Sequence, residues 1–252
     1  MTDPQKTLSI YIPTWERQEL LNNLLASIEP QMTDEVEVFV SVNKSSQPYV
    51  LPDWVKYREN LYNVGGDANI AMCQVSTTGR YLWVIGDDEV LTEDAISTTL
   101  AAIRTEPGLI FQVPKSDNWR IPMGVTYPNY KAFCEHLLAT RKGWIIPAHS
   151  LISTNTFLRD AWSADSCLAH FDTRYGFHYG MLQNLFDKPV HVVAKPTVIV
   201  GHHPSIFQAD SEAIATHMSL YPRIVYDFLD FITEHTGVQI PRAVFRGGFP
   251  EA

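Results

Sequence analysis

The stretch that decides the fold is YLWVIGDDE, residues 81–89. Residues 81–85 are almost wholly apolar, which is typical of a central strand buried on both faces of a parallel sheet. Three acidic residues, Asp87, Asp88 and Glu89, follow this strand directly. Like charges at contact distance repel each other unless a cation or a hydrogen-bond donor lies between them. The sequence therefore predicts a buried strand that delivers an acidic cluster to one edge of a sheet.

The segments around this strand alternate between strand-like and helix-like patterns. Strands are predicted at 8–12, 36–42, 55–58 and 109–113, and helices at 20–28, 67–75 and 92–103. Asp67 and Thr92 are expected to cap the last two helices. Such alternation predicts an α/β fold, with a mostly parallel sheet and helices on both faces.

The second half of the chain has a less regular pattern. Residues 115–129 are rich in Pro, Asn and Gly and predict a long loop. Helical spacing predicts helices at 130–140, 155–162, 175–186 and 211–236, and apolar runs predict strands at 190–193 and 197–200. No internal repeat or low-complexity segment is visible in the sequence.

Composition restricts the class of protein. Hydrophobic residues make up 45% of the 252 residues, so a large core can be buried. The net charge of −9 argues against broad nucleic-acid binding, because an acidic surface repels phosphate backbones. The spacing of Cys73, Cys134 and Cys167 is that of neither a disulfide framework nor a zinc site. With no signal-peptide pattern and no apolar run long enough to span a bilayer, the sequence predicts a cytoplasmic protein.

Three short segments with polar side chains follow predicted strands at the point where each strand ends. They are Pro13-Thr14-Trp15-Glu16, Asn43, and Gly86-Asp87-Asp88-Glu89. Ligands of parallel sheets bind beyond the carboxyl ends of the strands, so these residues are expected to form one site. Carboxylate oxygens favour Mg²⁺ or Mn²⁺, which commonly link them to phosphates. From spacing alone, a solvated acidic turn is an equal alternative to a metal site.

Three motifs in a fixed order carry a family resemblance. They are LSIYIPTWER (residues 8–17), NVGGDAN (63–69) and TGRYLWVIGDDE (78–89). Together they resemble the donor-site half of family-2 glycosyltransferases of the GT-A fold, most closely the abequosyltransferase-like branch. That branch runs I-P-T-Y-N-R, then N-x-G-x-D-x-N, then an apolar strand ending in L-G-D-D-D, a motif of the DXD type. The resemblance extends over roughly residues 8–110 and fades afterwards.

The resemblance implies a GT-A, Rossmann-like sheet with a smaller acceptor-side region. Residues 1–113 would form the half that binds the nucleotide-sugar donor. Residues 114–252 would form the acceptor-binding and catalytic half of the same single domain, with helices at the C-terminus. The implied donor, a UDP-sugar, would be bound together with Mn²⁺ or Mg²⁺.

The resemblance also assigns roles to residues. Those implied to line the nucleotide are Pro13, Thr14, Trp15, Glu16, Asn63, Gly65, Gly66 and Asn69. Asp87 would face the ribose or the donor sugar, Asp88 would be the principal metal ligand, and Glu89 would assist it. The plainer alternatives are a core position for Trp15 and an ordinary turn for the glycines.

Two departures from the family pattern affect these expectations. Many relatives carry an Asp after the second strand that reads the uracil ring, whereas this chain has Asn43, which can still hydrogen-bond a base edge. The family's later Glu-Asp pair, which contains the catalytic base, is also missing after Phe171-Asp172-Thr173-Arg174-Tyr175. His178 is the first candidate for the base, because histidine accepts protons near neutral pH. Asp172 is the second, with a helix N-cap as its alternative role.

His202 and His203 follow a predicted strand and precede Pro204. Either they supply a further metal ligand, or they belong to a surface turn. The function expected is sugar transfer from a nucleotide-diphosphate sugar to an acceptor hydroxyl, inverting and dependent on Mg²⁺ or Mn²⁺. The expected acceptor is a surface-polysaccharide intermediate or another hydroxylated molecule.

Three alternatives remain open at this point. One is sugar transfer to a hydroxymethylated base of phage-type DNA. Another is a catalytically inert module that binds nucleotide sugars, which the missing Glu-Asp pair favours. The third is a nucleotidyltransferase, although the chain has no Gly-rich phosphate loop of the usual patterns.

Overall fold

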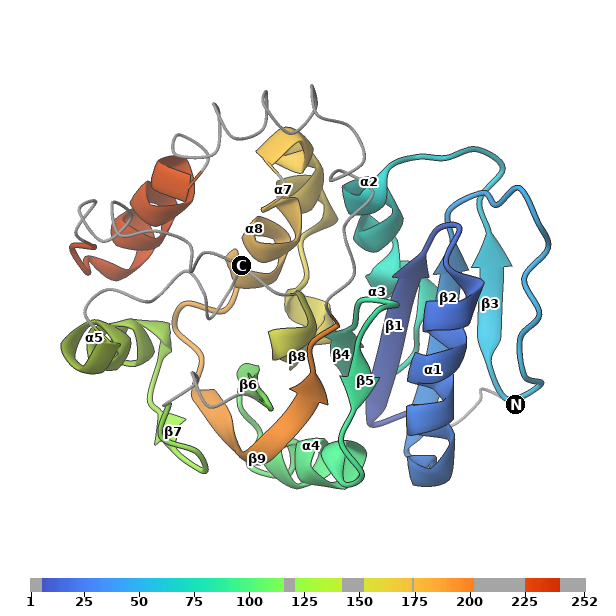
Figure 1. The fold of residues 1–252 in the computed structure, drawn as a ribbon. Coiled ribbons are helices and arrows are strands. Elements are labelled where there is room, and N and C mark those ends of the chain that lie inside the picture. The colour runs from blue at the N-terminus through green and yellow to red at the C-terminus, as the bar shows by residue number, and fades with distance from the viewer. Residues whose placement is uncertain (1–5, 116–120, 142–151, 174, 202–224, 241–252) are drawn as a thin grey trace.

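A single mixed sheet runs through the protein (Figure 1). The computed structural model describes residues 6–115, 121–141, 152–173, 175–201 and 225–240. The strands are β1 (Leu8–Thr14), β2 (Val36–Val42), β3 (Lys56–Glu59), β4 (Tyr81–Val84), β5 (Val90–Leu91), β6 (Leu109–Pro114), β7 (Thr126–Tyr127), β8 (Asn155–Leu158) and β9 (Val190–Ile199). Their order is β3-β2-β1-β4-β8-β6-β9-β5, and β7 pairs with β9.

The strands β3, β2, β1 and β4 are parallel, so their carboxyl ends meet at one edge of the sheet. Beyond them, β8 is antiparallel to both β4 and β6, while β6 and β9 are parallel again. The sheet therefore continues from the first half of the chain into the second without a break between strands.

Helices cover both faces of the sheet, as predicted. They are α1 (Gln18–Ile28), α2 (Gly66–Ala71), α3 (Cys73–Ser76), α4 (Ala95–Ile103), α5 (Tyr130–Arg141), α7 (Ala164–Ala169), α8 (Gly176–Leu182) and a helix over 225–236. Leu21, Leu24, Leu25 and Ile28 bury one stripe of α1. On the opposite face, the Tyr11 hydroxyl donates to the Asn69 carbonyl and fixes α2 on β1. In the part of the chain that the structure describes, no helix is long and apolar enough to cross a membrane.

The structure confirms the predicted strands and helices of the first half but not their caps. Gly65 and Asp94, rather than Asp67 and Thr92, occupy the N-cap positions of α2 and α4. Thr92 instead donates its hydroxyl to the Pro196 carbonyl, a contact between segments far apart in sequence. Local spacing cannot reveal such a contact.

The helix predicted at 155–162 is wrong. Residues Asn155–Leu158 form β8, and a 3-10 turn, Arg159–Ala161, follows. Asn155, Thr156 and Phe157 are fully buried, and β8 pairs with strands on both sides, so sheet pairing overrides the helical spacing. The two strands predicted at 190–193 and 197–200 are one strand, β9, with a register shift against β6. Of the helix predicted at 211–236, residues 211–224 lie outside the described residues.

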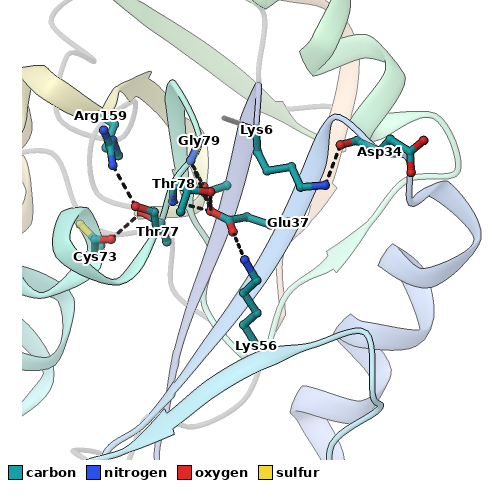
Figure 2. A network of polar contacts seen from close by, with 10 residues as sticks. Lys6, Asp34, Glu37, Lys56, Cys73, Thr77, Thr78, Gly79 and Arg159 are labelled. Atoms are coloured by element: carbon teal, nitrogen blue, oxygen red, sulfur yellow. Dashed lines mark hydrogen bonds and ion pairs between the residues drawn. The ribbon is translucent and has the colours of Figure 1, made fainter. Parts of the chain in front are cut away.

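A buried carboxylate, that of Glu37, ties neighbouring strands together near their amino ends (Figure 2). Glu37 on β2 accepts hydrogen bonds from the Ser9 hydroxyl of β1 and from the Thr78 backbone and hydroxyl in the turn before β4. Lys56 of β3 pairs with its other oxygen at 3.0 Å. Burial alone would raise the pKa of Glu37, but the donors on Ser9, Thr78 and Lys56 outweigh it and hold that pKa below its ordinary value.

We predict that Glu37→Gln lowers the free energy of unfolding by about 2 kcal/mol at neutral pH, because buried donors lose a charged acceptor. The folded pKa lies below the ordinary 4.5, so this stabilisation is full above 4.5 and disappears as the pH falls through the folded value. Urea unfolding across this pH range measures it. Exposed Glu35→Gln is the control and should change little. Equal effects of the two variants would contradict the role given to Glu37.

Candidate functional site

The carboxyl ends of β1 and β4 are joined by a side-chain hydrogen bond. Thr14, the last residue of β1, is buried and donates its hydroxyl to Asp87 Oδ2 at 2.6 Å. β1 and β4 are parallel neighbours, which brings the end of one beside the turn that follows the other. The structure thus brings together two of the residues expected at the site.

Tyr49, in the loop between β2 and β3, extends this contact into a chain of donors. The Arg17 backbone N–H donates to the Tyr49 hydroxyl at 3.0 Å, and this hydroxyl lies 3.1 Å from Thr14 Oγ1. Because the Thr14 proton is used on Asp87, the Tyr49 hydroxyl donates to Thr14. All these donors are oriented toward Asp87, as an ionised carboxylate requires.

Arg17 is the cation of the acidic cluster. Its Nη1 lies 3.1 Å from Asp87 Oδ1 and 3.5 Å from Asp88 Oδ2. Burial raises the pKa of Asp87 to about 6, although Thr14 and Arg17 oppose that rise. Asp87 is therefore held at both oxygens. Asp88 is more exposed, with 25% of its side chain accessible against 6% for Asp87.

Glu89 turns toward the protein interior. It accepts hydrogen bonds from the Ser153 hydroxyl at 3.2 Å and from the Gly201 backbone N–H at 3.2 Å. Burial, and then the charge of Asp88, raise the pKa of Glu89 to about 7. Ser153 also accepts a hydrogen bond from the Gly86 N–H, so it braces the whole acidic turn. Glu89 thus links this turn to the end of β9.

A divalent cation fits this cluster as a shared site. Within the described residues, no group of three or more His, Cys, Asp or Glu side chains is placed to hold a metal ion. Mg²⁺, however, is usually held by one or two carboxylates together with substrate phosphates. Asp88 is accessible and suits that arrangement. Burial disfavours the ionised form of the neighbouring Asp87, and a cation beside it would favour that form. His202 and His203 lie outside the described residues.

A network of amide side chains shapes the edge next to the acidic turn. Asn43 donates to Asn63 Oδ1 at 2.7 Å, and its own oxygen accepts from the Val64 N–H at 2.9 Å. Asn69, at 2% exposure, accepts from the Ser41 hydroxyl and donates to the Ser41 carbonyl. Both ends of the Asn43 amide are therefore used to hold the loop that follows β3.

The remaining residues of the predicted donor site lie around these networks. Pro13 and Trp15 are half-buried, and Glu16 is exposed with its backbone at φ 56°. The Glu16 carboxylate accepts from the Ser46 N–H at 2.6 Å and so secures the loop after β2. Gly65, at φ 83°, has open space where a side chain would stand, and Gly66 is also exposed.

The two candidate bases lie in the second half of the chain, on and just before α8. His178, on α8, is 2% exposed and is surrounded by the rings of Tyr175, Phe177 and Phe228. Asp172 lies in a 3-10 turn, Phe171–Thr173, before α8, whose N-cap is Tyr175. The role of either residue as a base stays a prediction.

Three contributors to this arrangement were not singled out from the sequence. Arg17 ends the first motif and could have been paired with the acidic cluster by charge. Tyr49 lies in a loop and Ser153 in a 3-10 turn, Ile152–Thr154; both are far from the cluster in sequence, and no spacing signals their contacts.

A family model and a curated protein both match this sequence. The family model described as "Glycosyl transferase family 2" matches residues 9–149. Abequosyltransferase RfbV of Salmonella typhimurium is 23% identical to this chain over an alignment of 252 residues. The alignment covers 89% of this chain and 73% of that protein.

Solved structures share the fold at lower identity. The S. aureus TarS 1–349 structure in complex with UDP-GlcNAc superposes with a TM-score of 0.58 at 13% identity, and the alignment covers 87% of this chain. The mannosyltransferase PcManGT from Pyrobaculum calidifontis, in complex with GDP-Man and Mn²⁺, gives 0.54 at 13% identity over 89% of this chain. This chain spans 66% of the length of each of these two.

We predict that Asn43→Asp destabilises the loop at 60–65 by about 1–3 kcal/mol, because a carboxylate oxygen would face Asn63 Oδ1 in place of a donor. The matched control is Asn63→Asp. Its oxygen only accepts, from Asn43 and from the Gly65 N–H, so a carboxylate preserves both bonds. Thermal unfolding and amide exchange at 63–65 measure the effect. If Asn63→Asp proves the more damaging change, this description of the network is wrong.

Proposed function

The chain belongs to glycosyl transferase family 2, and from that membership we propose that Asp88 binds a divalent cation that holds the diphosphate of a nucleotide-sugar donor. Its fold is that of the GT-A glycosyltransferases, as the resemblance implied. Membership of the family makes the chain a glycosyltransferase, which decides against the nucleotidyltransferase and the inert module.

The observation that carries the proposal is the difference between the two aspartates. Thr14 and Arg17 hold both oxygens of Asp87, whereas the described contact of Asp88 is one ion pair at 3.5 Å. Asp88 is therefore the carboxylate that a cation can reach. Asp87, fixed by Thr14, faces the ribose or the donor sugar. Mn²⁺ or Mg²⁺ would neutralise the leaving diphosphate when bound.

The other residues of this edge shape the donor site. Glu89 accepts hydrogen bonds from Ser153 and Gly201 and so holds the acidic turn, including Asp88, in position. The amides of Asn43, Asn63 and Asn69 keep the loop before α2 in place for the nucleotide. Pro13, Trp15 and Glu16 border the base and ribose, and the open backbone at Gly65 and Gly66 admits the donor.

We propose a UDP-sugar as the donor, in keeping with the structural likeness to TarS with UDP-GlcNAc. The likeness to PcManGT with GDP-Man makes GDP-sugars the alternative. Since the Asn43 amide is engaged in the loop, base selection falls on backbone groups and on the residues around Trp15. A thermal-shift screen of nucleotide sugars with Mn²⁺ separates the two donors.

The transfer we propose is inverting. A base takes the proton of the acceptor hydroxyl as its oxygen attacks C1 of the sugar, and the nucleoside diphosphate leaves. His178 is the first candidate for this base and Asp172 the second. His202 or His203 would add a metal ligand.

The acceptor we propose is a glycan, the surface-polysaccharide intermediate of the family's usual setting. The relative RfbV is named an abequosyltransferase, which gives the sugar transferred and leaves the acceptor to be tested. The formal charge of −9 opposes a hydroxymethylated DNA acceptor, because a duplex would be repelled. Tight, salt-sensitive binding to such DNA would reverse this choice.

Asp88→Asn should abolish the strengthening of nucleotide binding by Mn²⁺, because the amide is a poor cation ligand. Exposed Asp160→Asn serves as the control for a lost negative charge. Calorimetric titration of UDP and GDP with and without Mn²⁺ measures the effect. Retention of the full Mn²⁺ effect in folded Asp88→Asn would refute the proposed metal site.

His178→Gln should slow release of nucleoside diphosphate by about 10²–10⁴-fold while leaving donor affinity unchanged. Circular dichroism is needed as a control, because His178 is buried among aromatic rings. If the folded variant turns over within a few-fold of wild type, the base is not His178. The same measurement on Asp172→Asn then tests the second candidate.

A further inference from the structure

Arg17 stands where the proposed cation has to bind. Its Nη1 contacts Asp87 Oδ1 at 3.1 Å and lies 3.5 Å from Asp88 Oδ2. Among the described residues, it is the one cation that forms an ion pair with either aspartate. A divalent cation bound to Asp88 would therefore lie close to the Arg17 guanidinium, which already contacts Asp88 Oδ2.

The main chain of Arg17 is anchored independently of its side chain. Its backbone N–H donates to the Tyr49 hydroxyl, and its carbonyl accepts the Leu21 N–H at the start of α1. The side chain is 26% exposed, so the guanidinium can leave the carboxylates without disturbing that anchor. Arginine is also suited to phosphate, which its planar donors bind at two oxygens.

We propose that Arg17 is a positioning residue that partly offsets the negative charges of Asp87 and Asp88 in the donor-free enzyme and keeps their cation affinity low until a diphosphate arrives. This inference rests on the proposed function, since it takes Asp88 as the metal ligand. When the donor binds, its diphosphate attracts the guanidinium and relieves the repulsion. Cation and donor then bind cooperatively, and each strengthens the other by the same factor.

Electrostatics sets the size of the effect. A unit charge and a double charge a few ångström apart in water repel enough to weaken binding by about tenfold or more. Arg17→Gln should therefore bind Mn²⁺ alone at least about tenfold more tightly than wild type. It should also lose most of the cooperativity between Mn²⁺ and UDP or GDP.

Titration of Mn²⁺ followed by electron paramagnetic resonance, without and with UDP or GDP, tests this without measuring turnover. Arg17→Lys retains the positive charge and should keep Mn²⁺ affinity near that of wild type. The control Arg104→Gln removes an exposed positive charge that pairs with Glu35, away from the acidic turn, and should change nothing.

Unchanged or weaker Mn²⁺ binding in folded Arg17→Gln would overturn the inference. If wild type then still binds Mn²⁺ with nucleotide, the proposed function survives and only the role of Arg17 is lost. If wild type binds no Mn²⁺ even with UDP or GDP, the metal site and this inference both fail.

Discussion

The hydrogen bond from Thr14 to Asp87 joins the ends of two parallel strands, and the candidate site depends on it. It holds the acidic turn against β1. Through the Tyr49 hydroxyl, the same contact fixes the loop after β2 and the start of α1. One buried threonine thus sets the relative positions of a carboxylate, a cation and a loop that come from three different parts of the chain.

Acidic side chains differ between the two ends of the parallel strands. Glu37, near the amino end of β2, is ionised and fully supplied with donors, so it stabilises the sheet. Asp87 and Glu89, beyond the carboxyl end of β4, have raised pKa values because burial exceeds what their donors supply. Glu37 serves the fold, whereas Asp87 and Glu89 carry an electrostatic cost that a bound cation would remove.

The sequence was sufficient for most of the first half of the chain because the signals there are local. Alternating Val residues predicted β2, the apolar run at 81–85 predicted β4, and the strand order brought their ends together. The failures are non-local. Residues 155–158 have ambiguous spacing, and only pairing with β4 and β6 makes them a strand. Arg17, Tyr49 and Ser153 gain their importance from contacts across the fold, which periodicity and capping rules cannot show.

Gly201 has a consequence for how the two halves of the chain act together. A methyl group at this position would overlap the carbonyl oxygen of Asp88, and the Gly201 N–H already binds Glu89. The backbone just after β9 therefore packs directly against the backbone of the acidic turn, with no side chain between them that could change its rotamer. A shift of β9 would therefore displace the backbone of Asp88, which ties the position of the acidic turn to the second half of the chain.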